Sequence, residues 1–211
     1  MRNYITKPVW SVCISLAMLG VAYTLTCGHW INANRCHGSL DALQKSCVNG
    51  SRTEVFPDDI DGKLAQLGIV LPSVAPSLAI YKPVVVVGNL AFVSGHVPRN
   101  ADGQILSGKL GEDAEVPAGQ SAARQCAIGV LASLRAELGT LNRIKRVVKT
   151  TGMVNCTADF EQHPEVINGF SQLFVDIWGE ENGRGARAAV GMVSLPRGAI
   201  CEVDVIVELH E

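Results

Sequence analysis

The stretch ARAAVGMVSLPRGAICEVDVI, which runs from Ala186 to Ile206, decides the fold of this 211-residue chain. Residues 189–194 form one run of two alternating sets of side chains, and residues 203–208 form a second. Turn residues around Leu195-Pro196 lie between the two runs. A two-residue period of this kind predicts β-strands, because successive strand side chains point to opposite faces of a sheet. We therefore expect two strands here, paired as a hairpin.

Two charged side chains hold similar places in these strands. Arg187 lies near the start of the first strand and Glu202 near the start of the second. In a hairpin both would lie at the open end, within reach of each other or of a shared ligand. A guanidinium can donate two parallel hydrogen bonds to a small carboxylate, and a neighbouring carboxylate can orient or deprotonate a water. An ordinary cross-strand ion pair fits the same spacing.

Three motifs resemble those of the Rid family of reactive intermediate deaminases, also labelled YjgF or endoribonuclease L-PSP. The C-terminal motif consists of Arg187-Ala-Ala-Val, Leu195-Pro196 and Cys201-Glu202-Val-Asp-Val-Ile. Upstream, Gly88-Asn89-Leu-Ala-Phe-Val-Ser94-Gly95-His96-Val97-Pro98 resembles the family's strand and turn, and Val166-Ile-Asn168-Gly-Phe170 before Leu173-Phe174 resembles its helix. The motifs follow the family's order and cover about residues 75–209.

The resemblance implies a fold, an assembly and an activity. The fold would be an α+β, chorismate-mutase-like two-layer domain over residues 58–211, with a mostly antiparallel sheet and two helices on one face. Family members form homotrimers with ligand sites in clefts between subunits. The implied reaction hydrolyses a carboxylate-bearing imine or enamine, such as 2-aminoacrylate or 2-iminopropanoate, to a 2-oxo acid and ammonia. It needs no cofactor and no metal.

The resemblance also implies roles for individual residues. Arg187 would clamp the carboxylate of a small iminoacid ligand, and the backbone of Gly95 would come close to the same ligand. The carbonyl of Ala189 and the side chain of Glu202 would hold and polarise the attacking water. Further binding residues would be Tyr81, Asn168, Ser94 and His96. Structural readings stay open for two of these, because Tyr81 can cap a strand and Asn168 can lie on a helix surface.

One position departs from the family pattern. The family usually has Gln where this chain has His96, and a histidine can titrate near neutral pH and reshape a pocket. The long loop over residues 97–111 also resembles a longer and less characterised branch of the family. Both departures bear on the substrate more than on the fold.

Periodicity and turn residues predict the remaining elements without reference to any family. The expected helices and strands are a helix over 58–67 ended by Gly68, strands over 78–87 and 90–94 joined at Gly88-Asn89, a helix over 117–138 ended by Gly139, a strand over 143–155 with Ile144, Val147, Val148, Met153 and Val154 buried, and a helix over 160–178.

Composition argues against a nucleic-acid partner. The formal net charge is −2 and aromatic residues make up 5% of the chain, so neither a basic field nor a base-stacking platform is expected. None of the seven cysteines forms a C-x-x-C motif or a zinc-finger spacing. Cys126 falls on the apolar face of a predicted helix and should be buried. Cys36-His37 with Cys47 can be read as ligands or as a disulfide loop.

The N-terminus has a different character from the rest of the chain. Residues 8–27 carry no charge and are just long enough to cross a bilayer. Residues 1–28 are therefore expected to be a hydrophobic leader or membrane anchor, which would favour a secretory or membrane location, and residues 29–57 a linker. An organellar leader, which would mean a mitochondrial location, and a dispensable extension on a cytoplasmic protein are the alternatives.

Three functions remain open on the sequence alone. The first is imine and enamine deamination, which needs Glu202 and an ordered water in addition to Arg187. The second is a non-catalytic carboxylate-binding or regulatory module, which needs chiefly Arg187. The third is an endoribonuclease, which predicts a basic groove that the charge balance does not favour.

Overall fold

The structure is a computed structural model that describes residues 59–74 and 80–211. The predicted leader, the linker and residue 58 lie outside the described residues. No helix within the described ranges has the length and the hydropathy that a membrane span needs. In chain order the elements are α1 (Ile60–Gln66), β1 (Val84–Val87), β2 (Leu90–His96), α2 (Val116–Leu138), a 3-10 turn (Leu141–Arg143), β3 (Ile144–Asn155), α3 (His163–Gly183), β4 (Ala186–Met192), a second 3-10 turn (Pro196–Gly198) and β5 (Cys201–Leu209).

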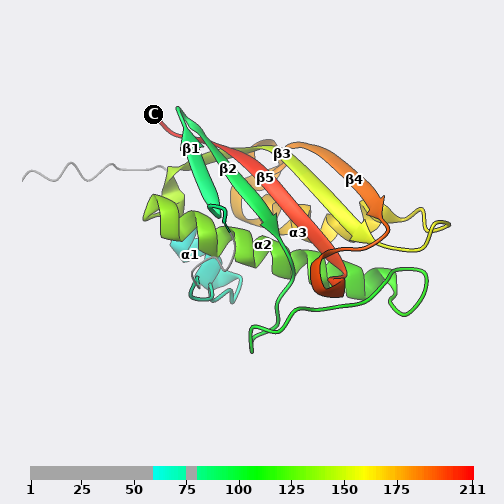
Figure 1. The fold of residues 1–211 in the computed structure, drawn as a ribbon. Coiled ribbons are helices and arrows are strands. Elements are labelled where there is room, and N and C mark those ends of the chain that lie inside the picture. The colour runs from blue at the N-terminus through cyan, green and yellow to red at the C-terminus, as the bar shows by residue number, and fades with distance from the viewer. Residues whose placement is uncertain (1–58, 75–79) are drawn as a thin grey trace, which may run out of the picture. The chain divides into compact units, whose positions relative to one another are not determined.

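The described elements form two layers. A five-stranded sheet has the order β1-β2-β5-β3-β4, and α2 and α3 lie side by side against one of its faces (Figure 1). All strand pairs are antiparallel except β3 with β4. The expected α+β fold, with a mostly antiparallel sheet and two long helices on one face, is confirmed.

The expected hairpin between β4 and β5 is wrong. β5 lies between β2 and β3, whereas β4 pairs in parallel with β3 at the sheet edge. The inward side chains Val203, Val205 and Val207 are fully buried, which suits β5 to a central position. The Ala- and Gly-rich β4 has little to bury and takes the edge. Periodicity predicted both strands, but it carries no information on which strands become neighbours.

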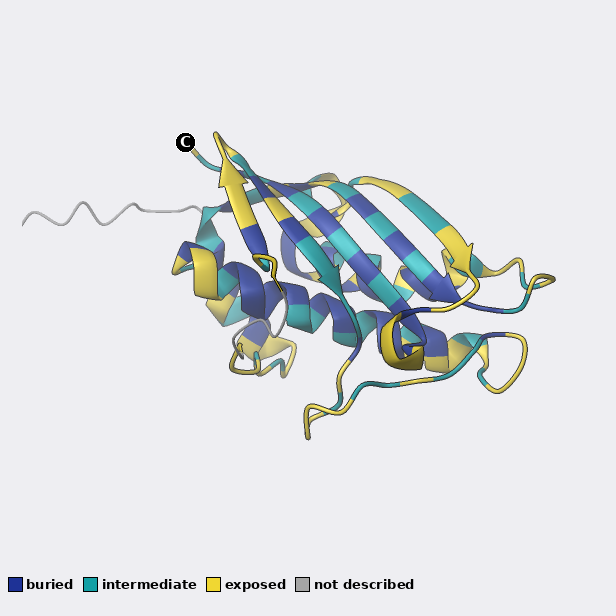
Figure 2. Cartoon of the chain, viewed as in Figure 1, coloured by how far each residue is buried: buried dark blue, intermediate teal, exposed yellow. Residues whose placement is uncertain are grey.

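No helix of residues 59–74 or 80–211 covers the outer face of the sheet (Figure 1). Along β5, fully buried inward residues alternate with half-buried outward ones, as the bands of Figure 2 show. Val148 and Met153 were expected in the core but are 36% exposed and half-buried, respectively. Val148 is the extra residue of a bulge between β3 and β5, and Met153 faces outward opposite Glu202.

The two long helices pack closely on the sheet. α2 ends where Gly139 adopts a φ of 79°, as predicted, and Cys126 on its inner face is fully buried. α3 begins three residues later than expected and continues past a break at Gly179, where φ is 75°. The helices approach one another at Gly169, where an added Cβ would collide with the backbone oxygen of Gln120. Only glycine permits this approach.

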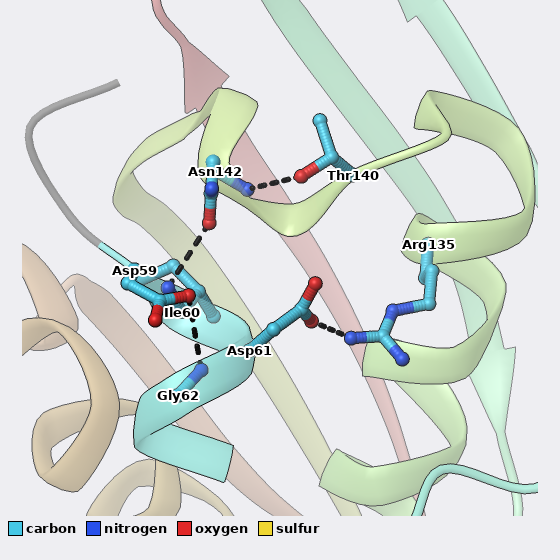
Figure 3. Close-up of polar contacts among 7 residues, drawn as sticks. All are labelled: Asp59, Ile60, Asp61, Gly62, Arg135, Thr140 and Asn142. Atoms are coloured by element: carbon cyan, nitrogen blue, oxygen red, sulfur yellow. Dashed lines mark hydrogen bonds and ion pairs between the residues drawn. The ribbon is translucent and has the colours of Figure 1, made fainter. Parts of the chain in front are cut away.

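Polar contacts fix the short helix α1 against the first 3-10 turn and α2 (Figure 3). Asp59 caps the helix, and the backbone N–H of Ile60 donates to Asn142 Oδ1 over 3.0 Å. Asp61 forms an ion pair with Arg135 of α2. The Ile60 side chain is fully buried, so α1 contributes to the core.

Candidate functional site

Arg187 is held against the start of α3. It is the second residue of β4 and pairs with the buried Thr150 of β3, so its side chain lies on the helix side of the sheet. Its Nη1 donates to Asn168 Oδ1 over 2.9 Å and to Ser171 Oγ over 3.1 Å. Its Nη2 donates to the carbonyl of Pro164 over 3.4 Å. Asn168 and Arg187 therefore come together, as the resemblance implied.

The bonds of Arg187 leave its charge available. All three acceptors are neutral, and no carboxylate of residues 59–74 or 80–211 forms an ion pair with it. A guanidinium has five N–H groups, so Nε–H and one N–H of Nη2 remain for a further acceptor. These two groups can serve the two oxygens of one carboxylate. A groove of about 870 Å³ includes Arg187 and Asn168 in its lining.

Gly95 and Glu202 form a second group. The register of β2 against β5 shifts between Val93 and His96, which marks a bulge at Ser94 and Gly95. A Cβ on Gly95 would collide with the carboxylate of Glu202, so glycine is what lets this carboxylate lie against the β2 backbone. Burial, and secondarily the charge of Asp204, raises the pKa of the Glu202 carboxyl above its ordinary value. Such a carboxyl holds its proton more readily.

The two groups lie on opposite faces of the sheet. Arg187 is opposite Thr150, and Glu202 is opposite Met153 three residues further along β3. Because strand side chains alternate, an odd separation without an intervening bulge places the two on opposite faces. The expectation that Arg187 and Glu202 lie within reach of each other is therefore corrected. Ala189 pairs with Gly152 and lies on the helix side with Arg187.

His96 packs towards α2 rather than beside the Glu202 carboxylate. Its Nδ1 donates to the Ser94 carbonyl over 2.7 Å, so its Nε2 accepts from the Ser133 hydroxyl over 2.8 Å. Burial lowers the pKa of His96, and the hydrogen bond to Ser94 only partly opposes this effect. A neutral ring in this place supports the bulge that carries Gly95. The expected ligand contact of His96 does not follow from this position.

The other expected binding residues lie at the start of the first strand pair. Ser94 Oγ donates to the carbonyl of Lys82 over 2.7 Å, and Tyr81, the residue before Lys82, is 53% exposed. Sequence reasoning missed Ser171, although it follows Asn168 by three residues on a helix and so shares its face. Within the two described ranges, no three His, Cys, Asp or Glu side chains converge in a way that would hold a metal ion.

Comparisons with known proteins agree with this architecture. Residues 61–209 match the family model described as "YjgF/chorismate_mutase-like, putative endoribonuclease". The protein TCP17 of Trypanosoma cruzi is 44% identical over 151 residues, which are 72% of this chain and 94% of that protein. The crystal structure of Atu1372 from Agrobacterium tumefaciens, whose function is described as unknown, is also 44% identical, with a TM-score of 0.65 over 72% of this chain and 94% of its own.

A further solved structure extends the agreement. A protein of Shewanella oneidensis, described as a "putative endoribonuclease", is 31% identical, with a TM-score of 0.68 over 72% of this chain and all of its own. The matched residues contain both groups, Arg187 with Asn168 and Gly95 with Glu202. The chain therefore belongs to the YjgF family, which is also called the Rid or endoribonuclease L-PSP family.

Proposed function

We propose that this protein hydrolyses carboxylate-bearing imines and enamines to 2-oxo acids and ammonia. The observation that carries the proposal is the exposed guanidinium of Arg187. It is fixed by three neutral acceptors and keeps two N–H groups free for a carboxylate. Membership of the family supports the same choice, since the resemblance to the Rid family implies this reaction.

The chemistry needs few groups. The free edge of Arg187 would bind the carboxylate of an iminoacid such as 2-iminopropanoate. Glu202, whose pKa is raised by burial, would take a proton from a water that attacks the imine carbon. The protonated Glu202 would pass this proton to the imine nitrogen, which gives a carbinolamine. Glu202 would then take the hydroxyl proton and transfer it to the amino group, so that the C–N bond breaks, ammonia leaves and the 2-oxo acid remains. No cofactor enters this sequence.

A complete site would require a second copy of the chain. Arg187 and Glu202 lie on opposite faces of the sheet, so a ligand in contact with both would have to bridge two subunits. The outer face, which no described helix covers, also presents Phe92 and Val190, 42% and 44% exposed, and these would favour self-association. We therefore propose that the sites form between subunits, and the resemblance to the Rid family implies that the assembly is a homotrimer with three equivalent sites.

A kinetic comparison tests the proposal. 2-Aminoacrylate is generated in solution, and its loss is followed with wild type, Arg187→Ala and Arg99→Ala. Arg99 is the matched control, because it is exposed, lies outside the groove and donates to the carbonyl of Gly103 in its own loop. We expect acceleration with wild type and Arg99→Ala, and near-background rates with Arg187→Ala of unchanged size and circular dichroism.

Other outcomes decide against deamination. Absence of acceleration across several iminoacids, with small carboxylates still binding only when Arg187 is present, would favour a non-catalytic binding module. Cleavage of a labelled RNA that survives Arg187→Ala would favour the endoribonuclease function that the Shewanella protein's description suggests.

A further inference from the structure

A thiol and an imidazole meet next to the edge strand, outside the groups described above. Cys156 follows β3 directly and His163 is the first residue of α3, and Cys156 Sγ lies 3.4 Å from His163 Nε2. The ring of Phe160 packs edge-on against the imidazole, with centroids 5.4 Å apart. The backbone N–H of Cys156 donates to the carbonyl of Met192 over 3.2 Å. Both partners of the pair are thus fixed in place.

Gly191 of β4 makes room for this pair. A Cβ at Gly191 would come within 2.6 Å of His163 Nε2 and 2.9 Å of Cys156 Sγ, so any other residue would displace one of them. Gly191 itself is exposed. At the sheet edge the pair is thus covered by the backbone of β4 alone, since Gly191 has no side chain. Cys156 as a whole is 7% exposed, so the residue keeps some contact with solvent.

The other two cysteines of the described ranges provide an internal contrast. Cys126 and Cys201 are fully buried, and their sulfur atoms lie 3.7 Å apart between α2 and β5. Burial raises the pKa of the Cys126 thiol well above its ordinary value, and no imidazole of the described residues is bonded to either sulfur. The thiolate is the nucleophilic form of cysteine, so an adjacent base and access to solvent should separate Cys156 from this inert pair.

We propose that Cys156 is a reactive thiol, activated by His163, that small peroxides oxidise. His163 Nε2 accepts the thiol proton, and the thiolate attacks one oxygen of the peroxide. The O–O bond breaks, and the departing hydroxide takes the proton back from the imidazolium and leaves as water. The sulfur is oxidised by two electrons to a sulfenic acid, and the peroxide supplies both the oxygen and the oxidising equivalents. The inference does not depend on deaminase activity.

Peptide-resolved mass spectrometry on the full chain tests the proposal. Time courses with hydrogen peroxide, each stopped with catalase and then labelled with dimedone in urea so that the label reaches every sulfenic acid, give a rate for each cysteine from its own peptide. We expect Cys156 to react at least about tenfold faster than Cys126 and Cys201, because it alone of the three has a base and contact with solvent. His163→Gln should slow Cys156 by about tenfold. The rates of the other two cysteines should stay unchanged.

Two results would overturn the proposal. The first is a Cys156 rate in wild type equal to those of Cys126 and Cys201, and the second is a Cys156 rate that His163→Gln leaves unchanged. If His163→Gln instead speeds all three cysteines, it has opened the fold. His163→Phe then replaces it, because a phenyl ring keeps the packing against Phe160 without a base. A Cys156 rate that this variant also leaves at the wild-type value overturns the proposal equally.

Discussion

Mixing two inactive variants tests whether the site is shared between subunits. Arg187→Ala removes the guanidinium from the helix side of the sheet, and Glu202→Gln removes the carboxylate from the outer face. Each variant alone should be nearly inactive. The loss of two charge-assisted hydrogen bonds to the substrate costs about 3–4 kcal/mol, a factor of more than a hundred in rate. Both variants should keep the wild-type oligomeric size.

The magnitude for the mixture follows from the geometry. In a closed trimer, each site would combine Arg187 of one subunit with Glu202 of the next. When the two variants are combined equally and at random, each position is intact with a probability of about one half, so about a quarter of the sites are complete. The assay unfolds and refolds the equimolar mixture to exchange subunits and then follows 2-aminoacrylate loss. About 25% of the wild-type rate is expected from this counting of symmetric sites.

A different result would refute this reasoning. Recovery must appear only after subunit exchange, and a refolded mixture of Arg187→Ala with the double variant should stay inactive. If the exchanged mixture of single variants shows only the sum of its two components, the site does not bridge subunits. The opposite orientation of the two side chains in one chain would then be unrelated to catalysis.

Other predictions concern stability and pH. Gly169→Ala should lower the free energy of unfolding by about 3 kcal/mol and Tm by several degrees, because the rigid backbone of Gln120 blocks the added Cβ. In Gly95→Ala the added Cβ meets the movable carboxylate of Glu202, so this variant should lose activity with little change in Tm. Glu202→Gln and Glu208→Gln should change the free energy of unfolding at pH 7, measured in urea, in opposite directions. Burial raises the pKa of Glu202, so the ionised form opposes folding, and Glu202→Gln should be the more stable protein at pH 7 by a margin that vanishes in acid. The hydrogen bond from Lys145 lowers the pKa of Glu208, so wild type has an advantage over Glu208→Gln at pH 7 that is lost as the pH falls. Because burial lowers the pKa of His96, the unfolded chain binds the proton first, and wild type should lose stability as the pH falls below about 6.5, a loss that His96→Gln removes.

The sequence predicted the elements of the fold better than their arrangement. Alternating valines identified β5, and a starting proline with a final glycine bounded α2 closely. Both signals are local, because they depend on strand and helix geometry alone. The pairing of β4 depends on which strand can bury more apolar surface at the centre of the sheet. Strand order therefore depends on the whole chain and cannot be predicted from any single position.

The candidate site shows the same division. The resemblance implied one site for Arg187, Asn168, Gly95 and Glu202, whereas the structure brings Arg187 together with Asn168 and, on the other face, Gly95 together with Glu202. His96 could not be oriented from the sequence, because the bulge at Ser94 and Gly95 inserts a residue and turns every later side chain of β2 to the other face. A period-two count without the bulge places His96 on the outer face. The bulge sends it to Ser133 instead.

The parallel pairing of β4 with β3 also bears on the order in which the two halves of the site assemble. Arg187 and its acceptors belong to one continuous segment, residues 144–192, in which β3, α3 and β4 follow one another. Gly95 and Glu202 meet only when strands from opposite ends of the domain pair. Short loops close at a lower entropic cost than long ones, so the guanidinium half should form earlier during folding and open independently of the carboxylate half. Native-state hydrogen exchange should show β3 and β4 protected as one cooperative unit while β1 and β2 exchange sooner.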